Sequence, residues 1–261
     1  MCELFAVSSD HPTVLRYQLR AFAKHGGGEF HNRDGWGIMF AQERDAFLFR
    51  EPAAASESAL ERLVARHPPP ARLVAAHIRL ATAGGALLAN THPFHRSRNG
   101  RVLHFAHNGS LPHLKTRFAA SKAAAGCIGD TDSELAFLLL LERLEPLEPD
   151  GTPEERYAVF REFCAEMREE GTANFLFADG EQLFAHAHRR RAQGSEAFGP
   201  GLSLRVLKPE EDSWSTRGAK IAATPENCVL LASVPLDKRK WSGLAEGTTV
   251  LIEHGRVRCQ D

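Results

Sequence analysis

The order of strand-like and helical segments is the feature that most restricts the fold of this 261-residue chain. Two pairs of apolar, strand-like runs are each joined by a short polar turn: Gly37–Ala41 with Ala46–Arg50, and Asn174–Ala178 with Gln182–Ala187 across an Asp-Gly turn. Hairpins of this kind form antiparallel pairs, and the runs do not alternate regularly with helices as parallel βαβ units require. The sequence therefore predicts an α+β fold with antiparallel sheets.

The other predicted elements lie on both sides of these hairpins. Further strand-like runs are Glu3–Ser8, Leu73–Arg79, Val102–His107, Val229–Val234 and Thr248–Glu253. Helix start signals occur at Asp10-His11-Pro12 and at three capping-box patterns, Ser58 with Glu61, Thr131 with Glu134, and Thr152 with Glu155. Apart from the irregular stretch Arg189–Gly218, no linker or change of composition divides the chain. We expect a single domain over residues 1–261, with the basic run Arg189–Arg191 in a solvated loop.

The overall charge and the cysteines restrict the class of protein. A formal net charge of −1 gives no reason to expect binding to nucleic acid or to an anionic membrane. No apolar run is long enough to span a bilayer, and Glu3 interrupts any signal-peptide pattern. The five cysteines are widely spaced and include no C-x-x-C pair, which favours free thiols in a reducing compartment. We expect a cytoplasmic protein.

Cys2 follows the initiator methionine directly. Methionine aminopeptidases remove Met1 when the next side chain is small, which would leave Cys2 with both a thiol and a free α-amine. An α-amine titrates near pH 8 and can act as the base that activates the thiol. A cysteine at this position is also a frequent accident of coding, so the rest of the chain has to decide between the two interpretations.

Two strand ends carry residues suited to binding a small molecule. Asn108 and Gly109 place a side-chain amide beside a backbone N–H, and two such donors can converge on an oxyanion. Asn-Gly is equally typical of a simple turn. Arg79 ends another strand and can bind a carboxylate through its two-pronged guanidinium, although a surface ion pair is the usual explanation.

Two loops add further candidates. Asp132 lies at the first position of a predicted helix, where a carboxylate can bind an ammonium group or favour the helix dipole. Capping explains Thr131 and Glu134 but assigns no role to Asp132. The segment His31–Gly37 contains two glycines around a tryptophan just before a strand, typical of a tight turn or a close backbone approach. Its candidate supporting residues are Asp34, Gly35, Trp36 and Gly37.

Taken together, these residues are complementary to one type of ligand. Cys2 supplies a thiol and an amine, and Asn108 with Gly109 supplies donors for an oxyanion. Arg79 matches an α-carboxylate and Asp132 an α-ammonium group. A compound with both groups and a distal carbonyl is glutamine or another γ-glutamyl compound.

Six ordered motifs resemble those of one known family, the class II, N-terminal-nucleophile glutamine amidotransferases. These motifs are the N-terminal Cys, D-G-W-G, H-I-R-x-A-T, N-T-H-P-F (Asn90–Phe94), H-N-G-S-L (His107–Leu111) and G-D-T-D-S-E. The resemblance covers residues 2–134 and extends through Leu231–Leu236, Trp241 and Gly247. His31-Asn32 stands where many relatives have Arg-Gly. The chain most resembles stand-alone bacterial members, which consist of the glutaminase domain alone, so we expect no synthase, isomerase or phosphoribosyltransferase domain.

The resemblance implies a fold, a reaction and residue roles. The fold would be a four-layer αββα sandwich of two antiparallel sheets, as in other N-terminal-nucleophile hydrolases. Cys2 would attack the γ-amide of glutamine, Asn108 and Gly109 would hold the oxyanion, Arg79 with the Thr82 region would bind the α-carboxylate, and Asp132 the α-ammonium group. Ammonia would leave, and water would hydrolyse the γ-glutamyl thioester. No cofactor or metal is implied, and a synthase or other acceptor enzyme could receive the ammonia.

Three alternatives stay open at this point. A γ-glutamyl amide hydrolase, like a stand-alone member of this fold in ergothioneine biosynthesis, would use the same nucleophile on a substrate other than glutamine. A metal-binding domain would draw on the clustered histidines, but their spacing fits no familiar zinc pattern, and His104 and His107 should lie on opposite faces of a strand. These histidines are His92, His95, His104, His107 and His113. A catalytically silent glutamine sensor would need Arg79 and Asp132 but no thiol.

Overall fold

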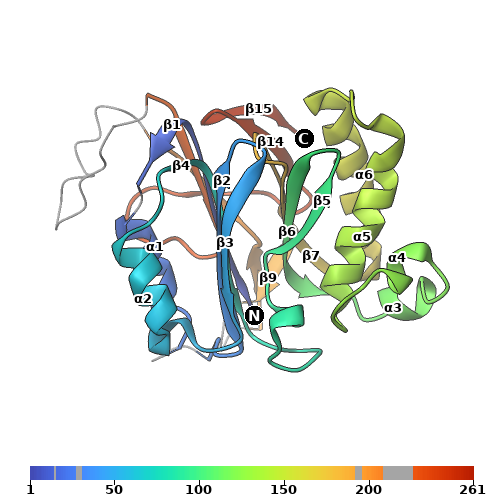
Figure 1. Ribbon diagram of the computed structural model, residues 1–261, viewed down its shortest axis with the longest axis horizontal. Helices are drawn as coiled ribbons and strands as arrows, with labels where there is room; N and C mark the ends of the chain where they lie inside the picture. Colours follow the sequence, from blue (N-terminus) through green and yellow to red (C-terminus); the bar gives the residue numbers. More distant parts are fainter. Residues whose placement is uncertain (15, 28–30, 192–195, 208–225) are drawn as a thin grey trace.

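Two antiparallel sheets face each other in the computed structural model, and helices cover the outer side of each sheet (Figure 1). The structure describes residues 1–14, 16–27, 31–191, 196–207 and 226–261. The layers follow the order helix, sheet, sheet, helix. This arrangement confirms the predicted α+β sandwich.

The first sheet has seven strands with β1 at its centre. Its order is β13 (Ser242–Gly243), β11 (Ser203–Leu207), β12 (Cys228–Ala232), β1 (Glu3–Thr13), β4 (Ala71–Arg79), β2 (Gly35–Gln42) and β3 (Asp45–Glu51). In the register of β1, Leu4 lies opposite His77 of β4 and Phe5 opposite Ala232 of β12. Since β1 has a partner on both sides, the residue before it, Cys2, lies at a fixed position beside the end of β4.

The second sheet has six strands and carries the Asn-Gly motif. Its order is β15 (Arg256–Gln260), β14 (Thr249–Glu253), β8 (Gln182–His186), β7 (Thr172–Ala178), β6 (Arg101–Ser110) and β5 (Phe94–Arg98). A separate two-stranded ribbon consists of β9 (Arg189–Arg191) and β10 (Phe198–Pro200). Figure 1 shows the N-terminus at one end of the space between the two large sheets.

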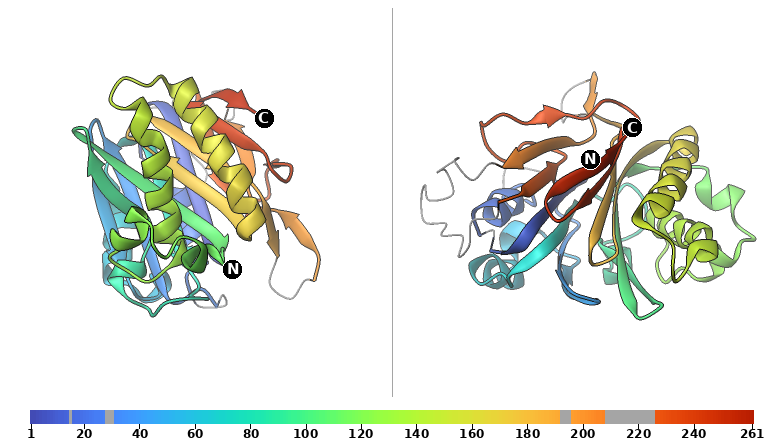
Figure 2. Two further views of the ribbon diagram at one scale, coloured as in Figure 1. Left: turned by 90° about the vertical axis from the view of Figure 1, so that its right-hand side faces the viewer. Right: turned by 90° about the horizontal axis from the view of Figure 1, so that it is seen from above.

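The helices bury the outer faces of the sheets. α1 (Arg16–Ala23) and α2 (Ala59–Arg66) lie on the first sheet, and α5 (Asp132–Leu144) with α6 (Pro153–Glu170) lie across the second (Figure 2). The short helices α3 (Leu114–Arg117) and α4 (Lys122–Ala125) precede α5, and 3-10 turns occur at Ala55–Glu57, Leu88–Asn90 and Glu145–Leu147. No helix in the described ranges is long and apolar enough to cross a membrane.

Side-chain size differs between the three buried layers. The layer between the sheets contains alanine, leucine, isoleucine, valine and methionine, and none of its buried members in the described residues is aromatic. The aromatic side chains pack between the sheets and the helices instead, as Phe105 and Phe175 of the second sheet do with Phe137 of α5. Along β1, Leu4 and Ala6 point between the sheets while Phe5 and Val7 point toward the outer layer. Both faces of this strand are buried from Glu3 to Ser9, which explains the uninterrupted apolar run Leu4–Val7.

One predicted helix start was wrong, and two of the predicted capping boxes were confirmed only as N-caps. Asp10 does not begin a helix, because β1 continues to Thr13 and the Asp10 carboxylate accepts from the backbone N–H of Asn227 at 3.0 Å. Two of the three capping boxes are incomplete: Ser58 and Thr131 each accept from the N3 backbone N–H, but reciprocal glutamate bonding is present only at Thr152. Glu134 accepts instead from Arg96 and from the backbone N–H of Gly129.

The stretch Arg189–Gly218 is more regular than predicted. It contains β9, β10 and β11, while residues 192–195 and 208–218 lie outside the described residues. β11 alternates buried and exposed positions, but its buried positions include Ser203 and Arg205, and Arg205 pairs with Asp237 at 3.0 Å. Strand prediction depends on apolar residues at alternate positions. A polar residue at a buried position, paired with a residue far away in the sequence, interrupts that pattern.

Candidate active site

The Cys2 thiol is held by one backbone unit at the end of β4. Its Sγ donates to the carbonyl oxygen of Leu80 at 3.3 Å and accepts from the N–H of Leu80 at 3.2 Å. Burial raises the pKa of the thiol, while the Leu80 N–H and the positive charge of Arg79 act in the opposite direction. A thiol with a raised pKa is protonated at neutral pH, so nucleophilic attack requires a base nearby.

The terminal amine lies in surroundings that disfavour its charge. Burial lowers the pKa of the Met1 amine, and Arg190 lowers it further, against opposing effects of Cys2 and Glu3. Arg190 belongs to β9 and reaches the buried Glu3 carboxylate at 3.3 Å. The other oxygen of Glu3 lies 2.6 Å from His25 Nδ1. The predicted solvated loop at Arg189–Arg191 is therefore a strand that supplies a counter-charge beside the nucleophile strand.

Arg79 is buried and its guanidinium is occupied by backbone oxygens. Nη2 donates to the carbonyls of Ala83 and Gly84 at 3.0 and 3.2 Å, and Nη1 donates to that of Gly85 at 3.0 Å. Arg79, the residue predicted to bind the substrate carboxylate, therefore holds the loop that follows β4 in this structure. Thr82 lies in the same loop and is exposed.

The loop before β2 connects to the same strand end. Asp34 Oδ2 accepts from the N–H of Ala81 at 2.7 Å, and the Asp34 N–H donates to the carbonyl of Arg79 at 3.2 Å. Asp34 therefore reaches the thiol only through the residue that follows Leu80. These bonds fix the chain immediately beyond the thiol.

Gly35 and Gly37 of this loop are required by the backbone, whereas the side chain of Trp36 points to the outer face of the first sheet. A Cβ on Gly37 would lie 2.1 Å from the carbonyl oxygen of His92, so this close approach requires glycine. Gly35 has a φ of +149°, also in the range that favours glycine. Trp36 points to the opposite face of the sheet, where its Nε1 donates to Glu51 at 3.1 Å.

Asn108 and Gly109 lie near the end of β6, facing β7. The Asn108 side chain is fully buried, and its Nδ2 donates to Ser233 Oγ at 3.2 Å. That same oxygen accepts from the N–H of Leu4 at 3.1 Å, two residues from Cys2. A Cβ on Gly109 would lie 1.8 Å from the carbonyl oxygen of Thr172, so no other residue fits there. The candidate oxyanion residues are thus connected across the two sheets to the nucleophile strand.

Asp132 anchors the chain beyond β6 to the first turn of α5. Its Oδ2 accepts from the N–H of Leu111 at 2.6 Å, and its side chain is partly exposed. His107 lies nearby, with Nε2 donating to the carbonyl of Thr172 and Nδ1 accepting from Ser133 Oγ, both at 2.9 Å. Burial lowers the pKa of His107, so its ring is neutral at physiological pH.

Asn90 joins the loop held by Arg79 to the loop before Asp132. Its Nδ2 donates to the Gly85 carbonyl at 3.1 Å and to Asp130 Oδ1 at 2.6 Å, and its Oδ1 accepts from the Asp130 N–H at 3.0 Å. Asn90 is completely buried. The two candidate subsites for an α-amino acid, Arg79 and Asp132, are therefore positioned relative to each other by one amide.

The clustered histidines point in different directions. His92 stacks between His77 and Phe94, with ring centroids 4.2 and 4.3 Å apart. His104 packs near His95, whereas His107 turns toward α5, as the strand alternation predicts. Among the described residues no three His, Cys, Asp or Glu side chains form a group that could hold a metal ion.

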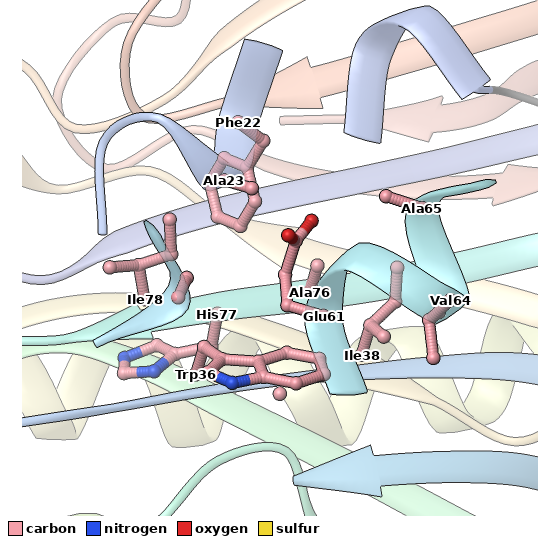
Figure 3. Close-up of a pocket in the computed structure, with 12 residues that line it drawn as sticks. Phe22, Ala23, Trp36, Ile38, Glu61, Val64, Ala65, Ala76, His77 and Ile78 are labelled. Atoms are coloured by element: carbon pink, nitrogen blue, oxygen red, sulfur yellow. The ribbon is translucent and has the colours of Figure 1, made fainter. Parts of the chain in front are cut away.

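An apolar pocket lies on the outer face of the first sheet and is separate from this site. It is formed by α1, α2 and the sheet beneath them, and Figure 3 shows the Glu61 carboxylate pointing into it among Phe22, Trp36 and Ile78. Burial raises the pKa of Glu61. Cys2 and Arg79 belong to the other side of the sheet, so this pocket takes no part in the chemistry of the thiol.

Four residues of the site were not predicted from the sequence to be functional: Glu3, Asn90, Arg190 and Ser233. Asn90 and Ser233 lay inside motifs that resemble the family, but a buried asparagine or serine carries no local signal of its partners. For Glu3, the only sequence signal of a functional role was a charged residue next to an apolar run. Arg190 was taken as solvated because its partner lies 187 residues away.

Sequence and structure comparisons agree on one family. The sequence model of the family "Glutamine amidotransferases class-II" matches residues 1–261. The chain is 36% identical over 189 residues to YafJ of Escherichia coli K12, which its name assigns provisionally to the glutamine amidotransferases; the match covers 71% of this chain and 72% of that protein.

Solved structures share the fold. The 2.0 Å crystal structure of a predicted glutamine amidotransferase from Pseudomonas aeruginosa PA01 matches with a TM-score of 0.64 and 29% identity, covering 99% of this chain and 100% of that one. Glutamine phosphoribosylpyrophosphate amidotransferase from B. subtilis matches with a TM-score of 0.64 at 16% identity, covering all of this chain and 49% of that enzyme. At that identity the second match supports the fold alone.

Proposed function

Because this chain belongs to the class II glutamine amidotransferases, we propose that it releases ammonia from the side-chain amide of glutamine with Cys2 as the nucleophile. One observation carries the proposal. The thiol is held at the start of β1 by Leu80, next to Arg79, and β1 is joined through Ser233 to the amide of Asn108. A nucleophile, a cationic side chain and a buried amide donor therefore belong to one connected structure.

The first half-reaction forms a thioester. After removal of Met1, the free amine of Cys2 takes the thiol proton and the sulfur attacks the carbonyl carbon of the glutamine side-chain amide. The carbonyl oxygen gains a negative charge, which the Asn108 side chain and the Gly109 N–H stabilise. The C–N bond then breaks, and the leaving nitrogen takes a proton from the α-ammonium group of Cys2 to depart as ammonia.

The second half-reaction releases glutamate. A water molecule gives a proton to the Cys2 amine and attacks the thioester carbon, again with the oxyanion held by Asn108 and Gly109. The C–S bond breaks and the thiol recovers its proton from the amine. Over both steps glutamine and water become glutamate and ammonia, so no cofactor takes part.

The substrate's own charges would be bound at the ends of β4 and β6. Arg79 would bind the α-carboxylate by exchanging carbonyls of the 83–85 loop for carboxylate oxygens, with Thr82 at the edge of that loop. Asp132 would bind the α-ammonium group through its partly exposed carboxylate. Asp34 and Gly37 would support the chain beside the thiol.

We further propose that residues 1–261 act as one glutaminase domain in the cytoplasm and that an acceptor enzyme uses the ammonia. All five cysteines are free, which supports a reducing compartment.

Labelling of the N-terminus tests the proposal. Intact-mass and peptide mass spectrometry should show a chain that begins at Cys2 and gains one adduct there from 6-diazo-5-oxo-norleucine. Cys2→Ala should abolish both labelling and ammonia release. Cys127→Ala, at another partly exposed cysteine, should change neither. Labelling at a cysteine other than Cys2 would refute the assignment.

Substrate comparison tests the choice of glutamine. Saturable release of ammonia from glutamine is expected. Saturable turnover of a bulky γ-glutamyl amide without turnover of glutamine would overturn the glutaminase proposal while leaving the nucleophile unchanged.

A further inference from the structure

Ser233 connects the nucleophile strand to Asn108 through one hydroxyl group. Its backbone N–H donates to the carbonyl of Leu4 at 2.9 Å, and its Oγ accepts from the N–H of Leu4 at 3.1 Å. Two hydrogen bonds therefore fix the position of this oxygen relative to β1. Ser233 is 5% exposed, so water does not compete freely for the hydroxyl.

The backbone of Asn108 is fixed independently. Its carbonyl oxygen accepts from Asn174 Nδ2 at 2.9 Å, and Asn174 is itself completely buried. The same Asn174 nitrogen donates to the carbonyl of Arg189, and its Oδ1 accepts from the N–H of His188 at 2.8 Å. With its backbone held in this way, the remaining freedom of Asn108 is the orientation of its side-chain amide.

The nitrogen and the oxygen of the Asn108 side-chain amide differ in their hydrogen bonding. Nδ2 donates to Ser233 Oγ at 3.2 Å, whereas the buried Oδ1 has no hydrogen-bond partner among the described residues. A buried acceptor without a partner costs about 1–3 kcal/mol. Ser233 Oγ already accepts from Leu4, and its own hydrogen can be donated to an acceptor.

A half-turn of the amide would give Oδ1 a hydrogen-bond partner, because the oxygen and nitrogen ends of the amide have nearly the same shape. Oδ1 would then accept the Ser233 hydroxyl hydrogen, and the NH2 group would take the place now occupied by Oδ1. Its hydrogens would be free to donate to a developing oxyanion, which an oxygen at that position would repel.

We propose that Ser233 is a positioning residue for the reaction, and that by donating its hydroxyl hydrogen to Asn108 Oδ1 it turns the amide NH2 group toward the oxyanion. The inference rests on the proposed function of Asn108. It goes further in assigning the orientation of the amide to a residue 125 positions away. Ser233 touches no reacting atom and acts only through Asn108.

The test compares Ser233→Ala with Asn108→Ala and with the double variant. Ser233→Ala should lower kcat for glutamine roughly tenfold or more, since loss of a whole oxyanion donor costs about 10²–10³. KM should stay within about twofold of the wild type. In the Asn108→Ala background, Ser233→Ala should cause no further loss of kcat, because Ser233 acts through the amide that is already missing.

Alkylation of Cys2 by iodoacetamide separates this role from a merely structural one. Alkylation forms no oxyanion, so its rate should be unchanged in Ser233→Ala. Ser8→Ala is a matched control: Ser8 Oγ also accepts a buried backbone N–H, from Gly255 at 3.0 Å, near the other end of β1. It should lower the thermal midpoint without lowering kcat.

A second pair of variants covers the case in which Ser233→Ala does not fold. Ser233→Thr keeps the hydroxyl group, and Ser233→Val has the shape of the threonine variant without the hydroxyl. Only the valine variant should therefore have a lower kcat. Wild-type kcat in Ser233→Ala or Ser233→Val would overturn the inference, as would a loss that adds fully to that of Asn108→Ala or a parallel loss of alkylation. A wild-type protein that releases no ammonia would overturn the proposed function and this inference with it.

Discussion

Glu3, Arg190 and the Met1 amine lie close together at the start of β1, where Glu3 is buried and Met1 is half-buried. A buried carboxylate is costly without a partner, and Glu3 has two, Arg190 and His25. The same arginine is positively charged beside the amine and disfavours the ammonium form. Arg190 therefore stabilises the buried acid and lowers the pKa of the Met1 amine. We expect the same positive charge to favour the uncharged Cys2 amine once Met1 is removed.

Arg190→Gln should move the acid limb of the pH dependence of kcat/KM to higher pH. Burial and Arg190 both lower the pKa of the Met1 amine, and we expect them to act in the same direction on the Cys2 amine once Met1 is removed. Removal of Arg190 takes away the second effect and leaves Glu3 less compensated. The base then loses its proton at a higher pH, so activity appears later as pH rises. Arg191→Gln, on the same strand but exposed, is the control and should leave the limb in place. An unchanged limb in Arg190→Gln would exclude the amine as the base or Arg190 as its neighbour.

At the scale of elements, the helix starts and loops decide where the charged subsites lie. Thr131 caps α5, and Asp132 follows as its first residue. Thr152 caps α6 with a complete capping box, and no candidate site residue lies in that helix. The two threonines therefore make the same local contact in different surroundings.

Thr131→Ala and Thr152→Ala should have the same effect on stability and different effects on activity. Each change removes an N-cap and should lower the free energy of unfolding by about 1 kcal/mol. Thr131→Ala should also raise the KM for glutamine, because the turn that carries Asp132 loosens. Denaturant titrations and steady-state kinetics on both variants measure this, and equal KM values would argue against Asp132 as a substrate ligand.

Asn90→Ala should weaken glutamine binding. The change removes three hydrogen bonds that join the Arg79 loop to the loop before Asp132. We expect a KM increase of roughly tenfold, equal to about 1.4 kcal/mol, with a smaller change in kcat. Asn99→Ala, which removes an exposed bond to Glu148, should change neither constant. A loss confined to kcat would show that Asn90 does not position the two subsites.

At the scale of the whole molecule, burial keeps several histidines uncharged. Burial lowers the pKa of His77 to about 3, of His104 to about 4 and of His186 to about 3. The unfolded chain binds protons at these histidines near their ordinary value of 6.5, while the folded chain does not. Above pH 6.5 these histidines therefore do not lower the free energy of unfolding. As the pH drops from 6.5 toward the pKa values in the folded chain, proton binding by the unfolded chain lowers the free energy of unfolding.

The free energy of unfolding should accordingly decrease between pH 6.5 and pH 5. Each buried histidine contributes up to about 1.4 kcal/mol per pH unit in this interval. His104→Gln should make the slope shallower by up to one such contribution, whereas the exposed His67→Gln serves as control. Denaturant titrations at several pH values give the slopes. A slope unchanged by His104→Gln would mean that this histidine is protonated in the folded state.

Much of the architecture was predictable because its signals are local. The hairpin β7–β8 turns at Asp179-Gly180, and Thr131 and Thr152 begin helices as their spacing predicted. Strands β5 and β11 were missed because histidine, arginine and serine occupy positions that face other parts of the fold. Asp10 was misread because its carboxylate caps a segment 217 residues away.

The sequence by itself determined the two antiparallel sheets, the helices on their outer faces and the family, since turns, caps and motifs act over a few neighbouring residues. Only the tertiary structure decided which groups meet. Leu80 holds a thiol 78 positions away, and Ser233 reaches Asn108 and Leu4 across 125 and 229 positions. Such contacts depend on how the two sheets pack, because a buried hydrogen bond forms only where folding brings donor and acceptor together. The tertiary structure also placed the Arg79 guanidinium against loop carbonyls, and no sequence motif predicted this contact.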